Sequence, residues 1–316
     1  MKSTQTVLTR GAARMVAPVL AMGVVILGMF VLAGCAPRPV GETGTEIVEA
    51  SAVASLLEQP GAVLVDARSA PDYRQGHLPG AVNISRADIV VMSPFPALLA
   101  PPEQIENALG SRGISNDSLV VVYDDNNNMD AARLWWTLKV YGHHDVKVVS
   151  GGLEALKREG YTLTTQAPTV TPATFRAQPA DESMMVSARE IRAHLDDPDP
   201  SVVLIDTRSD EEFLEGHIPG ALHIDYRENN FRDGTFRPVN HIRINYLKQG
   251  IDYTKEVILY CHTSIRGTPT FLALYNAGYR SLRLFDGAWV EWTANPMNPI
   301  YRPDPETARL RAPDQS

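Results

Sequence analysis

The sequence predicts an α/β protein built from two copies of one domain, each a parallel β-sheet with helices on both faces. Two observations lead to this prediction. The chain repeats itself at an offset of about 140 residues, and in each copy short apolar runs alternate with helical patterns. With 316 residues, each copy has enough chain to bury a hydrophobic core.

The repeat is carried by short segments that keep both their residue types and their order. One of them is Asp-x-Arg-Ser after an apolar run, and another is Gly-His-x-Pro-Gly-Ala. The matching segments are 63–69 with 203–209, 76–81 with 216–221, 120–124 with 257–261, and 148–152 with 284–288. Because the order is the same in both halves, we expect both halves to share one topology.

Strands and helices alternate along each copy. Apolar, β-branched runs predict buried strands at 63–65, 119–123, 202–205 and 257–260. Helical patterns lie at 50–57, 131–140, 188–195 and 268–277. Strands that alternate with helices in this way indicate a parallel sheet covered on both faces.

The domain boundaries follow from changes in composition. A stretch rich in Pro, Thr and Ala, without periodicity, predicts a linker between the copies. The expected layout is a first domain at 45–165, a linker at 166–183, a second domain at 184–302 and a polar tail at 303–316. We expect the tail to be frayed or to drape over the first domain.

The N-terminus has the pattern of an export signal. A basic segment precedes an apolar run at 15–32, and Leu-Ala-Gly then leads directly to Cys35. This arrangement resembles the bacterial lipobox, which implies cleavage after residue 34, lipid attachment to Cys35 and a short tether at 35–44. The expected location is the periplasmic face of the cell envelope. Because Ala36 is not Asp, the resemblance implies the outer membrane if the cell is Gram-negative. An uncleaved membrane anchor is the alternative.

The charge and the cysteine count exclude several classes of partner. Residues 1–34 carry three positive charges and no negative ones, so their removal changes the net charge from −8 to −11. Such an acidic chain has no long-range attraction for nucleic acid, and an anionic substrate would need a local positive site. With Cys35 lipidated, Cys261 has no partner for an intrachain disulfide. We expect a monomer that is attached to the membrane through its lipid.

Cys261 is placed for chemistry. It directly follows the predicted strand at 257–260, and Thr268 and Pro269 after it favour a helix start, with Thr268 as the N-cap. Amides of the loop and the helix N-terminus favour an anion at the sulfur, and Arg266 adds a positive charge. The alternative is an inert buried core cysteine. Ligands of α/β folds usually bind at the carboxyl ends of parallel strands, which favours the reactive interpretation.

These motifs resemble those of the tandem-domain rhodaneses, the thiosulfate sulfurtransferases. The resemblance covers about residues 45–302 and rests on both Asp-x-Arg-Ser segments, both Gly-His-x-Pro-Gly-Ala turns, the Tyr-Cys loop, and Asp-Gly-Ala-Trp at 286–289. It implies a persulfide on Cys261, formed from a small anionic sulfur donor and passed to a thiophilic acceptor such as cyanide or a thiol. It implies no cofactor and no metal. The histidines lack ligand spacing, and we expect His143 and His144 in a solvated turn.

The resemblance also implies the role of each site residue. Cys261 is the nucleophile, and the loop that follows it cradles the terminal sulfur, chiefly through backbone N–H groups. Ser264 stands where the family often has Gly, so a positive φ there would carry a cost. The expected substrate-binding residues are Arg208, His262, Thr263, Ser264, Ile265, Arg266 and Trp289, and the expected structural support is Asp206.

Two alternatives stay open for the charged residues beside the loop. Asp206 could be purely structural, bonding loop amides at the end of its strand. Arg208 could pair with Glu211 or Glu212 on the surface instead of contacting the donor. The Gly-His-x-Pro-Gly turns are expected to form the fold, with their histidines bonded to backbone groups.

The first domain departs from the pattern at the decisive position. Asp124 stands where the second domain has Cys261, and an acidic loop follows it at 125–130. We therefore expect this domain to be catalytically inactive and to close the cleft over Cys261. Trp135 and Trp136 are expected in core or interdomain packing. A calcium site in the acidic loop is a weak alternative, because the ordered ligand spacing is missing.

Thiosulfate is the expected donor, because Arg266 and a bulky His262 differ from the small uncharged loops typical of 3-mercaptopyruvate sulfurtransferases. The alternatives are a 3-mercaptopyruvate sulfurtransferase and a persulfide carrier that does not turn over. Phosphatases of related fold use Cys-x5-Arg, whereas this loop reads Cys-x4-Arg and suits a smaller sulfur centre.

Overall fold

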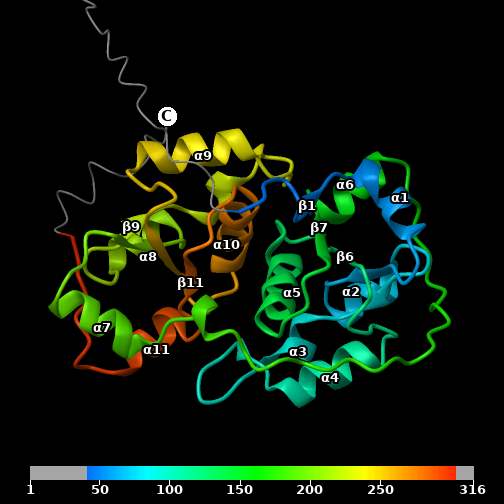
Figure 1. The fold of residues 1–316 in the computed structure, drawn as a ribbon, viewed down its shortest axis with the longest axis horizontal. Helices are drawn as coiled ribbons and strands as arrows, with labels where there is room; N and C mark the ends of the chain where they lie inside the picture. Colours follow the sequence, from blue (N-terminus) through cyan, green and yellow to red (C-terminus); the bar gives the residue numbers. More distant parts are fainter. Residues whose placement is uncertain (1–40, 304–316) are drawn as a thin grey trace, which may run out of the picture. The chain divides into compact units, whose positions relative to one another are not determined.

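The computed structural model describes residues 41–303 (Figure 1), which belong to one compact unit. The predicted signal peptide, the lipid attachment site Cys35, most of the tether and the tail beyond residue 303 lie outside the described residues. Within 41–303, no helix is both long enough and apolar enough to span a bilayer.

The first copy is a five-stranded parallel sheet. Its strand order is β1-β7-β6-β2-β3, and the strands are β1 (Ile47–Val48), β2 (Val63–Asp66), β3 (Val82–Asn83), β6 (Val120–Tyr123) and β7 (Val146–Val149). A small antiparallel pair, β4 (Val90–Val91) and β5 (Leu98–Leu99), lies outside this sheet. The helices are η1 (Ala50–Ala52), α1 (Val53–Leu57), α2 (Ala70–Gln75), α3 (Arg86–Ile89), α4 (Pro102–Gly110), α5 (Met129–Val140) and α6 (Gly152–Arg158).

The second copy repeats this sheet with four strands. Its order is β11-β10-β8-β9, all parallel, with β8 (Val202–Asp206), β9 (Leu222–His223), β10 (Glu256–Tyr260) and β11 (Leu282–Leu284). A single parallel bridge from Met185 to Leu284 replaces the outer strand β1. The helices are η2 (Glu182–Met184), α7 (Ala188–Asp196), α8 (Asp210–Glu215), η3 (Tyr226–Asn229), α9 (Val239–Lys248), α10 (Gly267–Asn276) and α11 (Ala288–Ala294).

The predicted α/β fold is confirmed, and each predicted strand and helix is present to within two residues. One helix start is wrong. Helix α10 begins at Gly267 with Arg266 at its N-cap, and Thr268 lies inside the first turn, where its Oγ1 donates to Ile265 O at 2.8 Å. The helix therefore begins closer to Cys261 than the capping residues predict.

The two copies share one hydrophobic core. Helices α5 and α10 lie side by side between the two sheets (Figure 1), and the residues of both contribute to a single buried cluster. Trp135 and Trp136 on α5 are fully buried, and the Trp135 ring lies 5.3 Å from the ring of Tyr275 on α10. The expectation of core or interdomain packing is confirmed, since both tryptophans lie in the core and Trp135 also contacts the second copy.

The linker at 166–183 runs along the first copy. Phe175 is buried, and Gln178 N and Asp181 N donate to Tyr141 O and Val140 O at the end of α5. One expectation fails here, because His143 is buried against Phe175, with ring centroids 5.8 Å apart, and only His144 is exposed.

Candidate active site around Cys261

Cys261 lies at the carboxyl end of β10, between β11 and β8. It is a free cysteine, and only 1% of its surface is exposed. Parallel strands bring their carboxyl ends to one edge of the sheet, so the segments after β8 and β11 meet the residues that follow Cys261. The site is therefore built from three neighbouring strand ends.

The loop at 262–266, called the cradle loop below, is fastened to the segment after β11. Ser264 has φ of 61°, and its hydroxyl donates to Phe285 O. In return Trp289 N donates to Cys261 O at 3.0 Å, and Val290 N donates to His262 O at 3.2 Å. Ser264 thus has the positive φ that would carry a cost, and the side-chain hydrogen bond offsets that cost.

Asp206 and Arg208 form a buried strut at the end of β8. Arg208 Nε and Nη2 donate to the Asp206 carboxylate at 3.0 and 2.6 Å, and Nη2 also donates to Gly216 O at 2.7 Å. The Trp289 ring covers the guanidinium, whose Cζ lies 4.3 Å from the ring centroid. The alternative in which Arg208 pairs with Glu211 or Glu212 on the surface is wrong. The buried Asp206 carboxylate holds the Arg208 guanidinium inside the domain.

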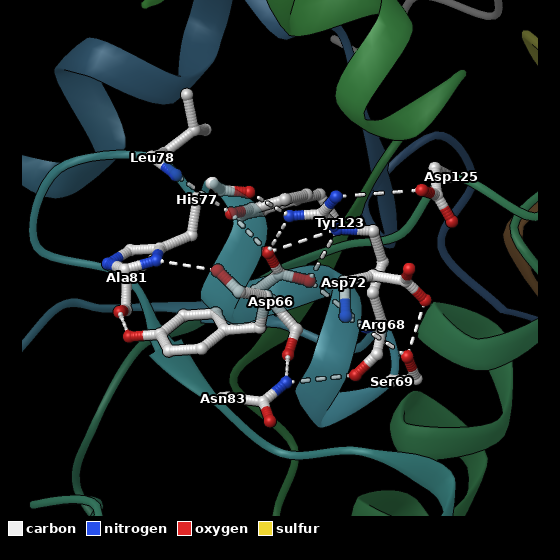
Figure 2. A network of polar contacts seen from close by, with 12 residues as sticks. Asp66, Arg68, Ser69, Asp72, His77, Leu78, Ala81, Asn83, Tyr123 and Asp125 are labelled. Atoms are coloured by element: carbon white, nitrogen blue, oxygen red, sulfur yellow. Dashed lines mark hydrogen bonds and ion pairs between the residues drawn. The ribbon is translucent and has the colours of Figure 1, made fainter. Parts of the chain in front are cut away.

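The first copy builds the same strut, as Figure 2 shows. Arg68 donates to Asp66 and Gly76 O, and the Tyr123 hydroxyl donates to Asp66 Oδ2 at 2.7 Å while it accepts the Leu78 N–H. A strut that is kept in the copy without a cysteine supports the structural interpretation of Asp206.

One atom of the strut arginine faces the loop. Arg68 Nη1 lies 3.6 Å from Asp125 Oδ2, and Asp125 aligns with His262. By this alignment Nη1 is the atom of Arg208 that faces the cradle loop. The turn histidines bond backbone carbonyls as expected, His77 to Tyr73 O and His217 to Phe213 O.

Arg266 has a partner that the sequence did not assign to it. Its Nη1 and Nη2 donate to the two carboxylate oxygens of Glu212 at 2.5 and 2.8 Å. These hydrogen bonds, with a smaller contribution from Ser209, lower the pKa of Glu212 to about 2. The pKa of Arg266 is raised, chiefly by its hydrogen bonds to Glu212 and further by Cys261.

The loop of the first copy shows what the cradle can hold. The buried carboxylate of Asp124 accepts four backbone N–H groups at 2.8–3.1 Å, those of Asn126, Asn128, Asp130 and Ala131. Burial outweighs these hydrogen bonds and raises the pKa of Asp124 to about 6. The carboxylate is saturated by its own loop.

The same four positions follow Cys261. They are Thr263, Ile265, Gly267 and Thr268, and Ser264 repeats the left-handed backbone of Asn127, at φ of 51°. Thr268 N donates to Ile265 O at 3.3 Å, and for the other three N–H groups residues 41–303 supply no protein acceptor. The cradle loop of the second copy thus has N–H donors that are free within the described residues, at positions where the N–H groups of the first copy bind the Asp124 carboxylate.

A residue of the first copy holds the segment after β11. Arg133, fully buried on α5, donates through Nη1 to Asp286 Oδ1 at 2.7 Å and through Nη2 to Ala97 O at 3.1 Å. Leu99 N donates to the other oxygen of Asp286 at 2.7 Å. Since Asp286 follows Phe285, the first copy fixes the segment that fastens the cradle loop. No motif or spacing in the sequence indicates this interdomain contact.

Comparison with known protein families agrees with these features. The rhodanese-like domain model matches residues 49–159 and again residues 187–295. The chain belongs to the rhodanese family. Both rhodanese-like domains include the strut, and the second includes Cys261 with its cradle loop.

Several curated relatives align over most of this rhodanese. A putative thiosulfate sulfurtransferase of Haloferax volcanii is 33% identical over 70% of this chain and 81% of its own length. The sulfur carrier protein TtuD of Thermus thermophilus is 31% identical over 70% of this chain and 83% of its length. A probable 3-mercaptopyruvate sulfurtransferase of Pseudomonas aeruginosa is 30% identical over 83% of this chain and 100% of its length.

A solved structure shares the fold. The anaerobic ergothioneine biosynthesis enzyme from Chlorobium limicola superposes with a TM-score of 0.73 at 24% identity, over 83% of this chain and 71% of that one. This likeness concerns the arrangement of the two rhodanese-like domains and not the reaction.

Proposed function

We propose that this rhodanese is a sulfurtransferase that moves sulfane sulfur from thiosulfate to a thiophilic acceptor, cyanide or a thiol, through a persulfide on Cys261. Relatives named for this class of enzyme support the sulfurtransferase activity. Thiosulfate is proposed as the donor because Arg266 gives the cradle loop a positive charge. The acceptor is proposed from its ability to attack sulfur.

One observation carries the proposal, and it is the matched pair of loops. In Asp124 the carboxylate oxygens are the third atoms out from Cα, and four loop amides bind them. In a persulfide of Cys261 the terminal sulfur would also be the third atom out from Cα. The aligned amides, and the helix α10 behind them, would therefore stabilise its negative charge.

The reaction then needs only this chain's own groups. The thiolate of Cys261 attacks the outer sulfur of thiosulfate, an Sγ–S bond forms, and the sulfur–sulfur bond of the donor breaks as sulfite leaves with the electron pair. The cradle amides bind the charge that stays on the terminal sulfur. The acceptor attacks that sulfur, takes it, and returns the thiolate.

Arg266 supports an anionic donor at the cradle. Its guanidinium is planar, carries its charge at all working pH values and matches an oxyanion with two parallel N–H groups. Relatives carry both thiosulfate and 3-mercaptopyruvate names, so the donor is the finer part of the proposal.

The test measures sulfite and thiocyanate release from thiosulfate and cyanide by the full chain and by Cys261→Ser. We expect turnover in the full chain and loss of at least 10³-fold in the variant, because within residues 41–303 Cys261 is the one cysteine available as a nucleophile. A full chain that releases pyruvate from 3-mercaptopyruvate but no sulfite from thiosulfate would overturn the choice of donor. If neither donor is turned over, the proposed enzymatic activity is contradicted, and the persulfide carrier becomes the favoured function.

We further propose that the chain is exported and anchored by a lipid on Cys35, on the evidence of the lipobox-like Leu-Ala-Gly-Cys at 32–35. Cell fractionation with Cys35→Ser tests this. The wild-type chain is expected in the membrane fraction with an acylated Cys35 as its first residue. A free Cys35 thiol in the mature protein would contradict the proposal.

A further inference from the structure

Glu212 is placed by a rigid helix start. Ser209 caps α8 by accepting the Glu212 N–H at 3.3 Å, and Glu212 Oε2 accepts the Ser209 N–H at 3.2 Å. The same oxygen accepts Arg266 Nη1, and Oε1 accepts Nη2. Both outer nitrogens of Arg266, the arginine of the cradle loop, are therefore engaged by one carboxylate.

Both arginines at the site carry a carboxylate partner, and the two pairs differ in burial. The Asp206 side chain is fully buried with Arg208, so separation of that pair would leave a charge in the protein interior. The side chains of Glu212 and Arg266 are 30% and 25% exposed. Glu212 can release Arg266 into water, so Arg266 is the cation that an incoming anion can take over.

The first copy makes no equivalent pair. Asp72 aligns with Glu212 and accepts the Ser69 hydroxyl, while the residue aligned with Arg266 is Met129. The carboxylate at this helix start is thus common to both copies, and the ion pair belongs to the copy that holds the cysteine.

We propose that Glu212 is a specificity-determining residue, a resident counter-ion that holds Arg266 while the site is empty and that a donor dianion must displace. The inference rests on the proposed function for its donor. Glu212 sets how strongly an anion is bound at the cradle, since every anion that reaches Arg266 either replaces this carboxylate or lies beside it.

The sign and scale of the effect follow from charge. Removing one negative charge beside the site strengthens anion binding, and the electrostatic gain is proportional to the charge of the anion. A gain of about threefold for a monoanion therefore corresponds to about tenfold for a dianion.

The experiment uses anion protection of Cys261 and needs no turnover. The full chain and Glu212→Gln are alkylated with iodoacetamide over a series of inorganic sulfate or acetate concentrations, and modification of Cys261 is followed by mass spectrometry of its own peptide. We expect the sulfate concentration for half protection to fall about tenfold in Glu212→Gln, and the acetate concentration about threefold. Gln keeps the shape and an acceptor oxygen, so the helix start is retained.

Two further variants separate this role from a general charge effect. Asp72→Asn removes the aligned carboxylate of the first copy and should leave both midpoints within twofold. In Arg266→Gln, the additional change Glu212→Gln should produce less than a twofold shift, since the exchanged cation is gone.

The outcomes are distinct. An unchanged or higher sulfate midpoint in Glu212→Gln, an equal shift in Asp72→Asn, or no protection by sulfate in any variant would overturn the inference. If the full chain fails to turn over thiosulfate while sulfate protection shifts as expected, the proposed function fails and Glu212 keeps its role toward anions.

Discussion

Ser264 has a left-handed backbone conformation, and its side chain makes a hydrogen bond inside the protein. A non-glycine residue at φ of 61° carries a conformational cost, and the Ser264 hydroxyl offsets it by donating to Phe285 O inside the protein. The residue therefore fastens the cradle loop to the segment after β11, at the same position where the first copy uses Asn127.

Substitution of Ser264 separates these two contributions. Ser264→Ala keeps the strained φ and loses the hydrogen bond, so the free energy of unfolding should fall by about 1–3 kcal/mol. Ser264→Gly loses the bond but relieves the strain, and should be less destabilising than Ala. Urea denaturation measures both, with the exposed Ser281→Ala as control. An alanine variant as stable as the wild type would contradict this account.

Asp124 gives a pH dependence with a definite sign. Its pKa is raised by burial from 3.8 to about 6 in the folded state, so the folded chain holds this proton more strongly than the unfolded chain. That contribution is present below pH 3.8 and is lost as the pH rises through about 6. A shift of this size corresponds to about 3 kcal/mol.

The matching measurement compares the wild type with Asp124→Asn, which stays neutral. Relative to Asp124→Asn, the wild type should lose up to about 3 kcal/mol of unfolding free energy as the pH rises from 4 to 7. Urea denaturation at several pH values measures it, and the exposed Asp117→Asn controls for loss of an acid. If the difference in unfolding free energy does not change with pH, the pKa of Asp124 is not raised by burial in the folded state.

At the residue scale the sequence located the groups of one contiguous segment and missed their distant partners. Cys261 and Arg266 are readable because strand end, loop and helix start are adjacent in the chain. Glu212 lies 54 residues from Arg266, and the sequence suggests it only as an alternative surface partner of Arg208. The capping pattern from Ser209 to Glu212 was readable, but it fixes the helix start and not the direction of the side chain.

The elements of the site are of two kinds. The central strands β2, β6, β8 and β10 could be predicted, because buried parallel strands are continuous apolar runs. Strands β1, β3 and β9 have two residues each, and two residues carry no periodicity. The start of α10 was misplaced because Thr268 bonds a carbonyl within the first turn instead of capping the helix.

The contact between α5 and the segment after β11 predicts a strong coupling. Arg133→Met leaves the partly exposed Asp286 without its cation and Ala97 O without a donor, so the cost should lie below the range of about 3–5 kcal/mol for a fully buried pair. In combination with Asp286→Asn the loss should be smaller than the sum of the two single losses. A double-mutant cycle by urea denaturation measures the coupling.

The control for this cycle is an exposed ion pair. Arg176 is 71% exposed beside Glu106, so Arg176→Met should change the unfolding free energy by less than about 1 kcal/mol. Strict additivity of Arg133→Met and Asp286→Asn would mean that the pair does not hold the segment after β11.

The shared core predicts that the two rhodanese-like domains unfold as one cooperative unit. A single buried cluster contains residues of both sheets together with α5 and α10, where Trp135 packs against Phe271 and Tyr275. The repeat in the sequence predicted two similar domains, but it could not predict that they pack face to face, because the apolar faces of α5 and α10 are also what two separate cores would need.

Heat denaturation of the full chain should therefore show one transition, with calorimetric and van't Hoff enthalpies equal. Trp135→Ala, which empties part of the shared cluster at a cost of about 3–5 kcal/mol, should lower that transition without splitting it. Differential scanning calorimetry measures both. Two resolved transitions in the wild type would contradict a shared core. The expected monomer and the absence of nucleic-acid binding stay predictions.

The carboxylate of Asp124 makes the first domain an internal reference for the state of the second. Its four amide hydrogens are held by the carboxylate and should exchange with solvent deuterium slowly above about pH 6, whether or not the second domain carries a persulfide. The aligned amides of Thr263, Ile265 and Gly267 lack a protein acceptor within residues 41–303, so their exchange should be fast in the free enzyme and slow once a terminal sulfur occupies the cradle. Amide exchange in the cradle loop therefore reports whether a terminal sulfur is bound. The aligned loop, 137 positions earlier in the same molecule, is the reference.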